Sequence, residues 1–186
     1  ITPRTLLIIL DTHNPGFVES GKLYESCKTV VVIDHHRKMV NHIDNAVIFY
    51  HEPFASSASE MVTELLQYLG DGVVVNRTEA EALLAGIMLD TKNFVLKTGV
   101  RTFEAAAFLR RAGADVTRVR KMFREDMEHC RIRTAIINKA EIYMNEFAIS
   151  TFDGANVSGA TVVGAKAANA LLNIQGIRGS FVLTSL

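Results

Sequence analysis

Cysteine is scarce in this sequence, as are the features of secreted and membrane-spanning proteins. The 186 residues include two cysteines, Cys27 and Cys130, which are far apart and belong to no Cys-x-x-Cys pair. Isolated cysteines indicate reduced thiols rather than a disulfide framework or a zinc site. The longest apolar runs, such as Leu6–Leu10, fall far short of the ~20 residues that a membrane-spanning helix needs, and we expect no signal peptide.

Net charge is also lacking. Lysine plus arginine number 20 and aspartate plus glutamate number 20, so the formal charge at neutral pH is zero. Without a basic field the chain has no means of gathering long nucleic acids, which favours a small ligand and argues against duplex nucleic acid. Neither a Gly-x-Ser-x-Gly elbow nor a phosphate-binding P-loop occurs, so serine-hydrolase and ATPase chemistry lack support.

Apolar residues, by contrast, are plentiful. The chain is 48% apolar and 22% charged, a composition typical of a globular protein with a sizeable core. Thr5–Leu10 and Thr29–Ile33 are short runs rich in β-branched and apolar residues, which is typical of parallel strands covered on both faces. A turn at Asn14–Gly16 and a short helix within Glu19–Cys27 complete a βαβ rhythm, and Ala46–Tyr50 offers a third strand.

Helices are predicted after the third strand. Ser57 and Glu60, and again Thr78 and Glu81, have the spacing of an N-terminal capping box. The second box precedes an apolar helix, Ala82–Leu89. Further helices are predicted at Arg101–Arg111 and, after the capping residue Asp115, over a charged stretch that runs to about Ala140.

The C-terminal part returns to strand-like composition. Glu141–Phe152 and Gly176–Leu186 read as strands, with a helix of small residues at Thr161–Leu172 between them. We therefore predict the α/β class: a parallel-sheet domain with flanking helices (1–114), a helical linker (115–141) and the start of a second α/β domain (142–186). Because strand patterns occupy both ends, we expect the chain to be cut from a longer protein.

Acidic residues terminate the two apolar strands. Asp11 and Asp34 fall at the carboxyl ends of these strands, where open parallel sheets bind their ligands. Two adjacent carboxylates repel each other, and a bound cation would offset that repulsion. His35 and His36 follow directly, and imidazole with carboxylate forms a ligand set suited to Mn, Fe or Zn. The alternative is a pair of loop histidines on a turn.

A third acid, Asp90, ends the helical stretch Ala82–Leu89. A carboxylate at the C-terminus of a helix faces the negative end of the helix dipole, so another interaction must stabilise it. A metal ion would do so, and a solvated surface aspartate is the alternative.

Three segments occur in order along the chain: Leu10–His13 (LDTH), Val31–Arg37 (VVIDHHR) and Met88–Phe94 (MLDTKNF). Together they resemble the motifs of the DHH phosphoesterases, a family named after its Asp-His-His tripeptide. Glu52–Glu60 (EPFASSASE) and Leu96–Phe103 (LKTGVRTF) resemble its membrane-anchored cyclic-di-AMP phosphodiesterase branch. A lone DHH tripeptide is a weak signal, whereas ordered motifs with two branch-like segments are a strong one.

The resemblance implies roles for the individual residues. The site would hold two metal ions, usually manganese, with Asp11 bridging both of them. His35 and Asp90 would bind one of the ions. Asp34 would not bind a metal ion itself but would orient His35, and His36 would contact an oxygen of the scissile phosphate.

The implied activity is manganese-dependent hydrolysis of cyclic-di-AMP to the linear dinucleotide pApA. The chain would be a cytoplasmic domain of a membrane-anchored parent, and a homodimer is compatible with it. A nanoRNase or pAp phosphatase acting on short linear nucleotides is the alternative within the family. The family's first motif, a histidine followed by two aspartates, and its GGGH segment do not occur here, so a non-catalytic nucleotide-binding sensor is the alternative outside enzymes.

Other polar residues near the three motifs are further candidates for the site. Asn93 and Arg101, after the third motif, could contact the phosphate or base of a substrate, or lie in a solvated loop and helix start. His13 lies two residues after Asp11 and could approach the site, but a polar role in its loop is predicted. The remaining histidines show no ligand pattern and are predicted to lie on the surface or in packing contacts: His42, His51 and His129.

Overall fold

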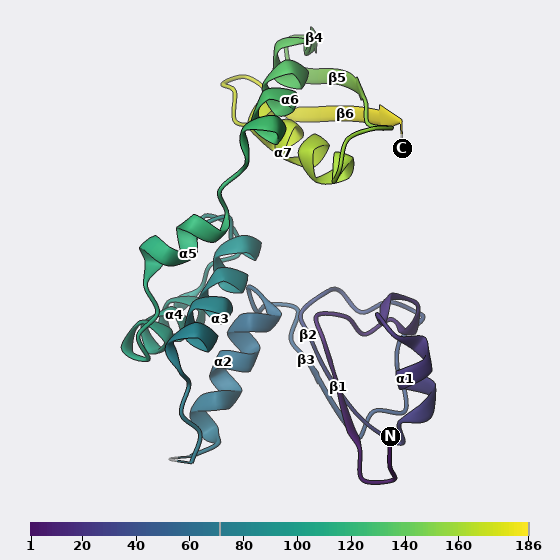
Figure 1. Ribbon diagram of the computed structural model, residues 1–186, viewed down its shortest axis with the longest axis vertical. Helices are drawn as coiled ribbons and strands as arrows, with labels where there is room; N and C mark the ends of the chain where they lie inside the picture. Colours follow the sequence, from purple (N-terminus) through teal and green to yellow (C-terminus); the bar gives the residue numbers. More distant parts are fainter. Residues whose placement is uncertain (71, 186) are drawn as a thin grey trace. The chain divides into compact units, whose positions relative to one another are not determined.

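The computed structural model describes residues 1–70 and 72–185 and separates into two compact units, Ile1–Phe123 and Arg124–Leu186. Figure 1 labels the strands and helices of both. Each unit has its own three-stranded sheet and its own hydrophobic core. The predicted α/β class with a parallel sheet is confirmed.

The first unit is built on a parallel sheet. Its strands are β1 (Leu6–Leu10), β2 (Thr29–Asp34) and β3 (Ile48–His51), in that spatial order. The short helices η1 (Pro15–Phe17) and α1 (Gly21–Ser26) lie in the crossover between β1 and β2. The register pairs Leu10 with Ile33 and Asp34 with His51, so the carboxyl ends of all three strands meet at one edge.

The two faces of the sheet are covered unequally. Val30 and Val32 on β2 are fully buried, and Ile33 packs against Met61 of α2. On β1, however, Leu6, Ile8 and Leu10 are each about half exposed. The prediction that both strands are covered on both faces is therefore wrong for β1, because Leu6, Ile8 and Leu10 share one face and that face is left partly open among the described residues.

Four helices complete the first unit: α2 (Ala58–Tyr68), α3 (Arg77–Asp90), α4 (Val100–Arg111) and α5 (Val116–Met122). Leu84 and Ile87 of α3 form a shared core with Leu109 of α4 and Val119 of α5. Burial of these apolar side chains fixes the end of α3, and with it Asp90, relative to the neighbouring helices.

Helix starts follow local capping chemistry. The Ser57 side chain accepts a hydrogen bond from the Glu60 N–H at 3.0 Å, as predicted for the start of α2. The predicted box at Thr78 and Glu81 is wrong. Asn76 and Glu79 form the reciprocal box instead, because Asn76 supplies a good capping side chain two residues earlier.

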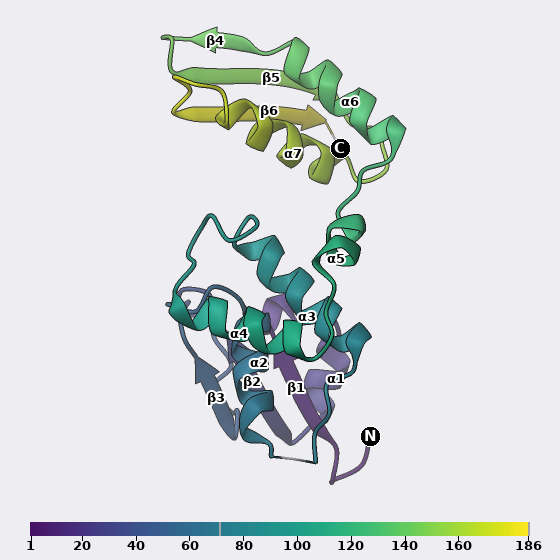
Figure 2. The same cartoon turned by 90° about the vertical axis from the view of Figure 1, so that its left-hand side faces the viewer.

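The second unit holds α6 (Met127–Asn138), β4 (Glu141–Tyr143), β5 (Phe147–Asp153), α7 (Ala160–Leu172) and β6 (Gly179–Ser185). Figure 2 shows both helices beside the sheet, and Ile136 of α6 packs with Val163 and Ala167 of α7. The single strand predicted at Glu141–Phe152 is wrong. Met144 and Asn145 have positive φ and turn the chain, so β4 pairs antiparallel with β5.

Residues 115–141, predicted as a linker, are shared between the two units. Helix α5 packs in the first core and α6 in the second, since each presents buried apolar residues to its own unit. Among the described residues, none of the helices has the length and apolar character required to cross a membrane.

The contact between α2 and α3 generates a stability prediction. A Cβ added at Gly86 would lie 2.9 Å from the Ser59 Cβ, inside contact distance. We expect Gly86→Ala to lower the free energy of unfolding by about 1–3 kcal/mol, although alanine is otherwise the better helix former. Urea unfolding measures this change.

Two further variants test the reason for that loss. Gly21→Ala in α1 is the matched control, because a Cβ there would meet nothing within 4 Å. Combining Gly86→Ala with Ser59→Gly should recover most of the lost stability. Equal stability of Gly86→Ala and the wild type would contradict the close approach of the two helices.

Candidate metal centre

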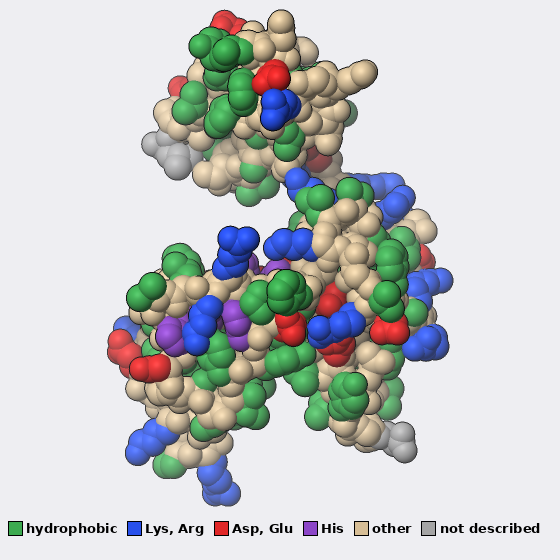
Figure 3. Space-filling model, turned by 180° about the vertical axis from the view of Figure 1, so that it is seen from behind, with side chains coloured by type: hydrophobic (Ala, Val, Ile, Leu, Met, Phe, Trp, Pro, Cys, Tyr) green, Lys and Arg blue, Asp and Glu red, His purple; other side chains and the backbone are tan. Residues whose placement is uncertain are grey.

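The carboxyl ends of β1 and β2 bring four chemically active residues together. Asp11 directly follows β1, and Asp34 is the last residue of β2. His35 and His36 come next in the chain, while Asp90 arrives from the C-terminal end of α3. Figure 3 shows histidine side chains on one face of this unit, with lysine or arginine side chains beside them.

His35 is the buried centre of the group. Its Nε2 lies 3.3 Å from Oδ1 of Asp11 and 3.6 Å from Oδ2 of Asp90. Its Nδ1 lies 3.3 Å from the Ala55 carbonyl oxygen, which can only accept, so we assign the ring proton to Nδ1. The Nε2 lone pair therefore faces two carboxylate oxygens.

Three lone pairs at such distances repel one another unless a cation lies between them. Ligand atoms that are each about 2.0–2.2 Å from one ion lie about 3–3.5 Å apart, which matches the spacing around His35. One imidazole nitrogen and two carboxylate oxygens also form a donor set suited to a divalent transition metal. Among the described residues, the compact group of possible ligand atoms comprises Asp11, His35 and His36. Asp90 lies 3.6 Å from His35, and its role as a metal ligand stays a prediction.

Backbone and electrostatic features mark the same two acids. Asp11 has a φ of 64°, a left-handed conformation that is uncommon outside glycine and often found at functional sites. The pKa of Asp90 is raised, first because burial disfavours its charged form and second because of the negative charge of Asp11. Both effects would be relieved by a bound cation.

Asp34 is satisfied by the protein itself. Its fully buried carboxylate accepts hydrogen bonds from the His13 ring, from Nδ1 of His36 at 2.8 Å and from the His36 N–H at 3.2 Å. Burial acts to raise the pKa of Asp34, but the hydrogen bonds from His13 and His36 outweigh it, so the pKa lies below its usual value. The family resemblance predicts that Asp34 orients His35, whereas the hydrogen bonds of Asp34 reach His36 and His13.

His36 is exposed over about half of its surface and has one ring nitrogen committed. Its Nδ1 belongs to a compact group of possible ligand atoms with Asp11 and His35. Because that Nδ1 donates to Asp34, its lone pair is not available to a metal ion in this arrangement. Nε2 is therefore the ring atom of His36 that can contact a bound ligand, such as an oxygen of the scissile phosphate.

Two histidines that carried no ligand pattern lie behind this group. The His51 Nε2 is 2.6 Å from the His36 carbonyl oxygen, and its ring packs edge-on against His13 at 5.3 Å. His51 sits opposite Asp34 in the sheet register, so strand pairing could have indicated its place. His13 is buried beside Asp34, and its position two residues after Asp11 already indicated a place near the site, although not its contact with Asp34.

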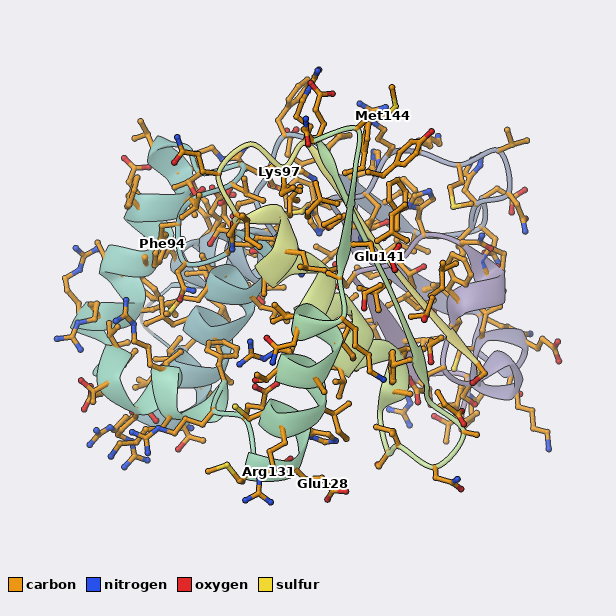
Figure 4. The ribbon with its side chains drawn as sticks, turned by 90° about the horizontal axis from the view of Figure 1, so that it is seen from above. Phe94, Lys97, Glu128, Arg131, Glu141 and Met144 are labelled. Carbon is orange, nitrogen blue, oxygen red and sulfur yellow. The ribbon has the colours of Figure 1, made fainter. Side chains whose placement is uncertain are left out.

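The loop after Asp90 has an unusual backbone. Lys92, Asn93 and Phe94 have positive φ values of 47°, 60° and 65°, a left-handed run that L-residues adopt only with strain. Phe94 stacks on Phe103 at 5.7 Å, which fastens the loop to α4, and Figure 4 labels Phe94 together with Lys97 from the same loop. Asn93 is exposed beside Asp90, where its role in substrate binding stays a prediction.

Arg101 is engaged elsewhere. Its guanidinium forms a two-pronged ion pair with Glu64 of α2, at 2.7 and 2.6 Å, and lies 3.9 Å from Glu52. The hydrogen bonds to Glu64 raise the pKa of Arg101 further above its usual value. A role in substrate binding would require Arg101 to leave this pair, which joins the start of α4 to α2.

Comparison with known proteins identifies the first unit. Residues 1–87 match the family model described as the DHH family, N-terminal domain. The chain is 43% identical over 184 residues to the cyclic-di-AMP phosphodiesterase PdeA of Listeria monocytogenes, covering 99% of this chain and 28% of that protein. It is 44% identical over 184 residues to the cyclic-di-AMP phosphodiesterase GdpP of Geobacillus thermodenitrificans, with the same coverage.

Two more distant proteins are also similar. A probable manganese-dependent inorganic pyrophosphatase of Thermotoga maritima is 37% identical over 91 residues, which is 49% of this chain and 16% of that protein. The solved structure of an exopolyphosphatase-related protein from Bacteroides fragilis superimposes with a TM-score of 0.82 at 19% identity, over 96% of this chain and 54% of that one. The latter shows the fold alone. The chain spans little more than a quarter of the length of the two phosphodiesterases.

The raised pKa of Asp90 gives a prediction for the metal-free protein. Replacing Asp90 with asparagine removes a charge that burial and Asp11 disfavour, so it should increase the free energy of unfolding near neutral pH. The increase should be at most about 1 kcal/mol, because the carboxylate is about a third exposed and water screens its charge. The gain should shrink as the pH falls from about 7 to about 4, since Asp90 takes up its proton earlier in the folded state than in the unfolded state.

Thermal unfolding in the presence of a chelator measures this difference. Glu104→Gln, at an exposed position of α4, is the matched control for loss of a negative charge. Added Mn²⁺ should then stabilise the wild type more than Asp90→Asn. A chelated Asp90→Asn protein that is less stable than the wild type at neutral pH would show that the Asp90 carboxylate is not under electrostatic strain.

Proposed function

Residues 1–87 belong to the DHH family, and from that membership we propose that the protein is a metal-dependent phosphodiesterase that hydrolyses cyclic-di-AMP to pApA. The observation that carries the proposal is the convergence of the His35 Nε2 with carboxylate oxygens of Asp11 and Asp90. The two relatives named cyclic-di-AMP phosphodiesterases, each above 40% identity, support the choice of substrate.

Manganese is the metal that we propose. The nitrogen and carboxylate donors suit it, and the similar pyrophosphatase carries manganese dependence in its name. When bound, a metal pair of this kind supplies a hydroxide nucleophile and neutralises charge on the phosphoryl oxygens. In the proposal, Asp11, His35 and Asp90 would hold one ion, and Asp11 would also serve as a ligand of the second.

The remaining residues act on the substrate side. His36 keeps its Nδ1–H on Asp34 and presents Nε2 to an oxygen of the scissile phosphate. The buried carboxylate of Asp34 accepts the Nδ1–H of His36 and so fixes which ring nitrogen of His36 faces the substrate. Asp34 and His36 therefore form the catalytic pair of the proposal, and Asn93 lies on the loop beside them.

The domain assignment follows the same reasoning. We propose residues 1–114 as the DHH domain without the family's first motif, and the second α/β unit as the beginning of a DHH-associated domain. In this arrangement every proposed metal ligand comes from the first unit.

One assay on the protein as the cell makes it tests both the proposed substrate and the proposed dependence on Mn²⁺. Cyclic-di-AMP is incubated with and without Mn²⁺, and products are separated by chromatography. We expect pApA only with Mn²⁺, and a loss of at least about 100-fold in His35→Ala, since loss of even supporting residues around a metal typically costs 10–100-fold. His42→Ala is the matched control, because His42 contacts a backbone carbonyl outside the cluster.

Parallel incubations distinguish the alternatives. Faster cleavage of short linear RNA or pAp than of cyclic-di-AMP would replace the proposal with a nanoRNase or pAp phosphatase. Binding of cyclic-di-AMP without turnover in Mn²⁺ would indicate a nucleotide sensor instead.

A further inference from the structure

His13 has both ring nitrogens engaged inside the first unit. The side chain is buried, with 2% of its surface exposed. Its Nδ1 contacts Oδ2 of Asp34, and its Nε2 lies 2.8 Å from the backbone nitrogen of Met39. Because that backbone N–H can only donate, Nε2 must carry the lone pair, and the proton of the neutral ring lies on Nδ1. His13 therefore donates to Asp34.

This donation divides the Asp34 carboxylate between two histidines. Oδ2 accepts from His13, while Oδ1 accepts from the ring and the backbone N–H of His36. With Oδ2 held, the carboxylate plane is fixed and Oδ1 has one direction in which to meet His36. The ring orientation of His36 thus depends on His13 through Asp34.

His13 also fastens the segment that follows the histidines. It accepts from Met39 through its ring and from the Ile43 N–H through its carbonyl oxygen, at 2.8 Å in both cases. Its ring meets Phe49 and His51 edge-on at 6.3 and 5.3 Å. An apolar side chain of the same shape would remove the acceptor of the Met39 N–H and leave a buried carboxylate oxygen of Asp34 without its donor, which is costly.

We propose that His13 is a positioning residue for catalysis: it fixes Asp34, and through Asp34 it sets the ring of His36 at the scissile phosphate. This inference rests on the proposed function for its catalytic part. Its structural part, the Nδ1–H tautomer of His13 and its coupling to His36, stands on the hydrogen bonds alone.

A matched pair of variants separates positioning from packing. In His13→Asn the amide nitrogen takes the place of Nδ1 and can donate to Asp34, but the side chain is too short to accept from Met39. In His13→Gln the amide oxygen can take the place of Nε2 and accept from Met39, but the donor to Asp34 is lost. Each variant loses one of the two hydrogen bonds, so we expect both to lower thermal stability. His13→Gln should lose more, because the bond to the buried carboxylate is worth more than the bond to the N–H of the exposed Met39.

Their kinetics should differ. We expect His13→Gln to lose kcat by about 10–100-fold and His13→Asn by less than about 10-fold, with KM and the affinity for Mn²⁺ changed little in both. Unchanged Mn²⁺ affinity is expected because His36, not a metal ligand, is displaced. Equal losses of kcat in the two variants, or a loss confined to His13→Asn, would overturn the proposal.

An NMR measurement on the metal-free protein is independent of activity. Long-range ¹H–¹⁵N spectra of the imidazole rings should show His13 as the Nδ1–H tautomer, and should show the ring signals of His36 shifted in His13→Gln but not in His13→Asn. An Nε2–H tautomer for His13, or unaffected His36 signals in both variants, would overturn it. If cyclic-di-AMP is not hydrolysed at all, the proposed function fails, while these spectra still decide whether His13 positions His36.

Discussion

Parallel pairing between β1 and β2 is the constraint on which the site depends. The register sets Leu10 beside Ile33, so the residue after each strand, Asp11 on one and the Asp34–His36 segment on the other, emerges at the same edge. Side chains alternate between the faces of a strand, and a slip of one residue would turn the buried Asp34 to the opposite face. The apolar side chains of β2, which are buried on both faces, make such a slip costly.

The acids of the site are stabilised in two different ways. Asp34 is fully buried, yet two histidine rings and a backbone N–H donate to it, and its pKa lies below the usual value. Asp11 and Asp90 instead face each other and the lone pair of His35, and the pKa of Asp90 is raised. A carboxylate that the protein already satisfies is suited to support, whereas carboxylates left in mutual repulsion are suited to bind a cation.

Backbone strain gathers around the same residues. Asp11, itself a proposed metal ligand, has positive φ, and so does the run Lys92–Phe94, which begins two residues after the proposed ligand Asp90. Packing maintains these conformations: Asp11 donates its N–H to the Ile33 carbonyl, and Phe94 stacks on Phe103. Strained conformations persist where surrounding structure determines them, and they are concentrated at functional sites. The second unit, with its separate core, contributes none of the proposed ligands.

The sequence by itself determined the three strands of the first unit, the acids at the ends of two of them and the Asp-His-His segment, because apolar runs and motif order are local properties of the chain. It could not determine which side chains meet across the fold. Only the tertiary structure shows that Asp34 contacts both His13 and His36 and that Arg101 is paired with Glu64. It also shows that one face of β1 is open. Hydrogen bonds between residues 21 or 37 positions apart depend on strand register and helix packing, and no local pattern records either of them.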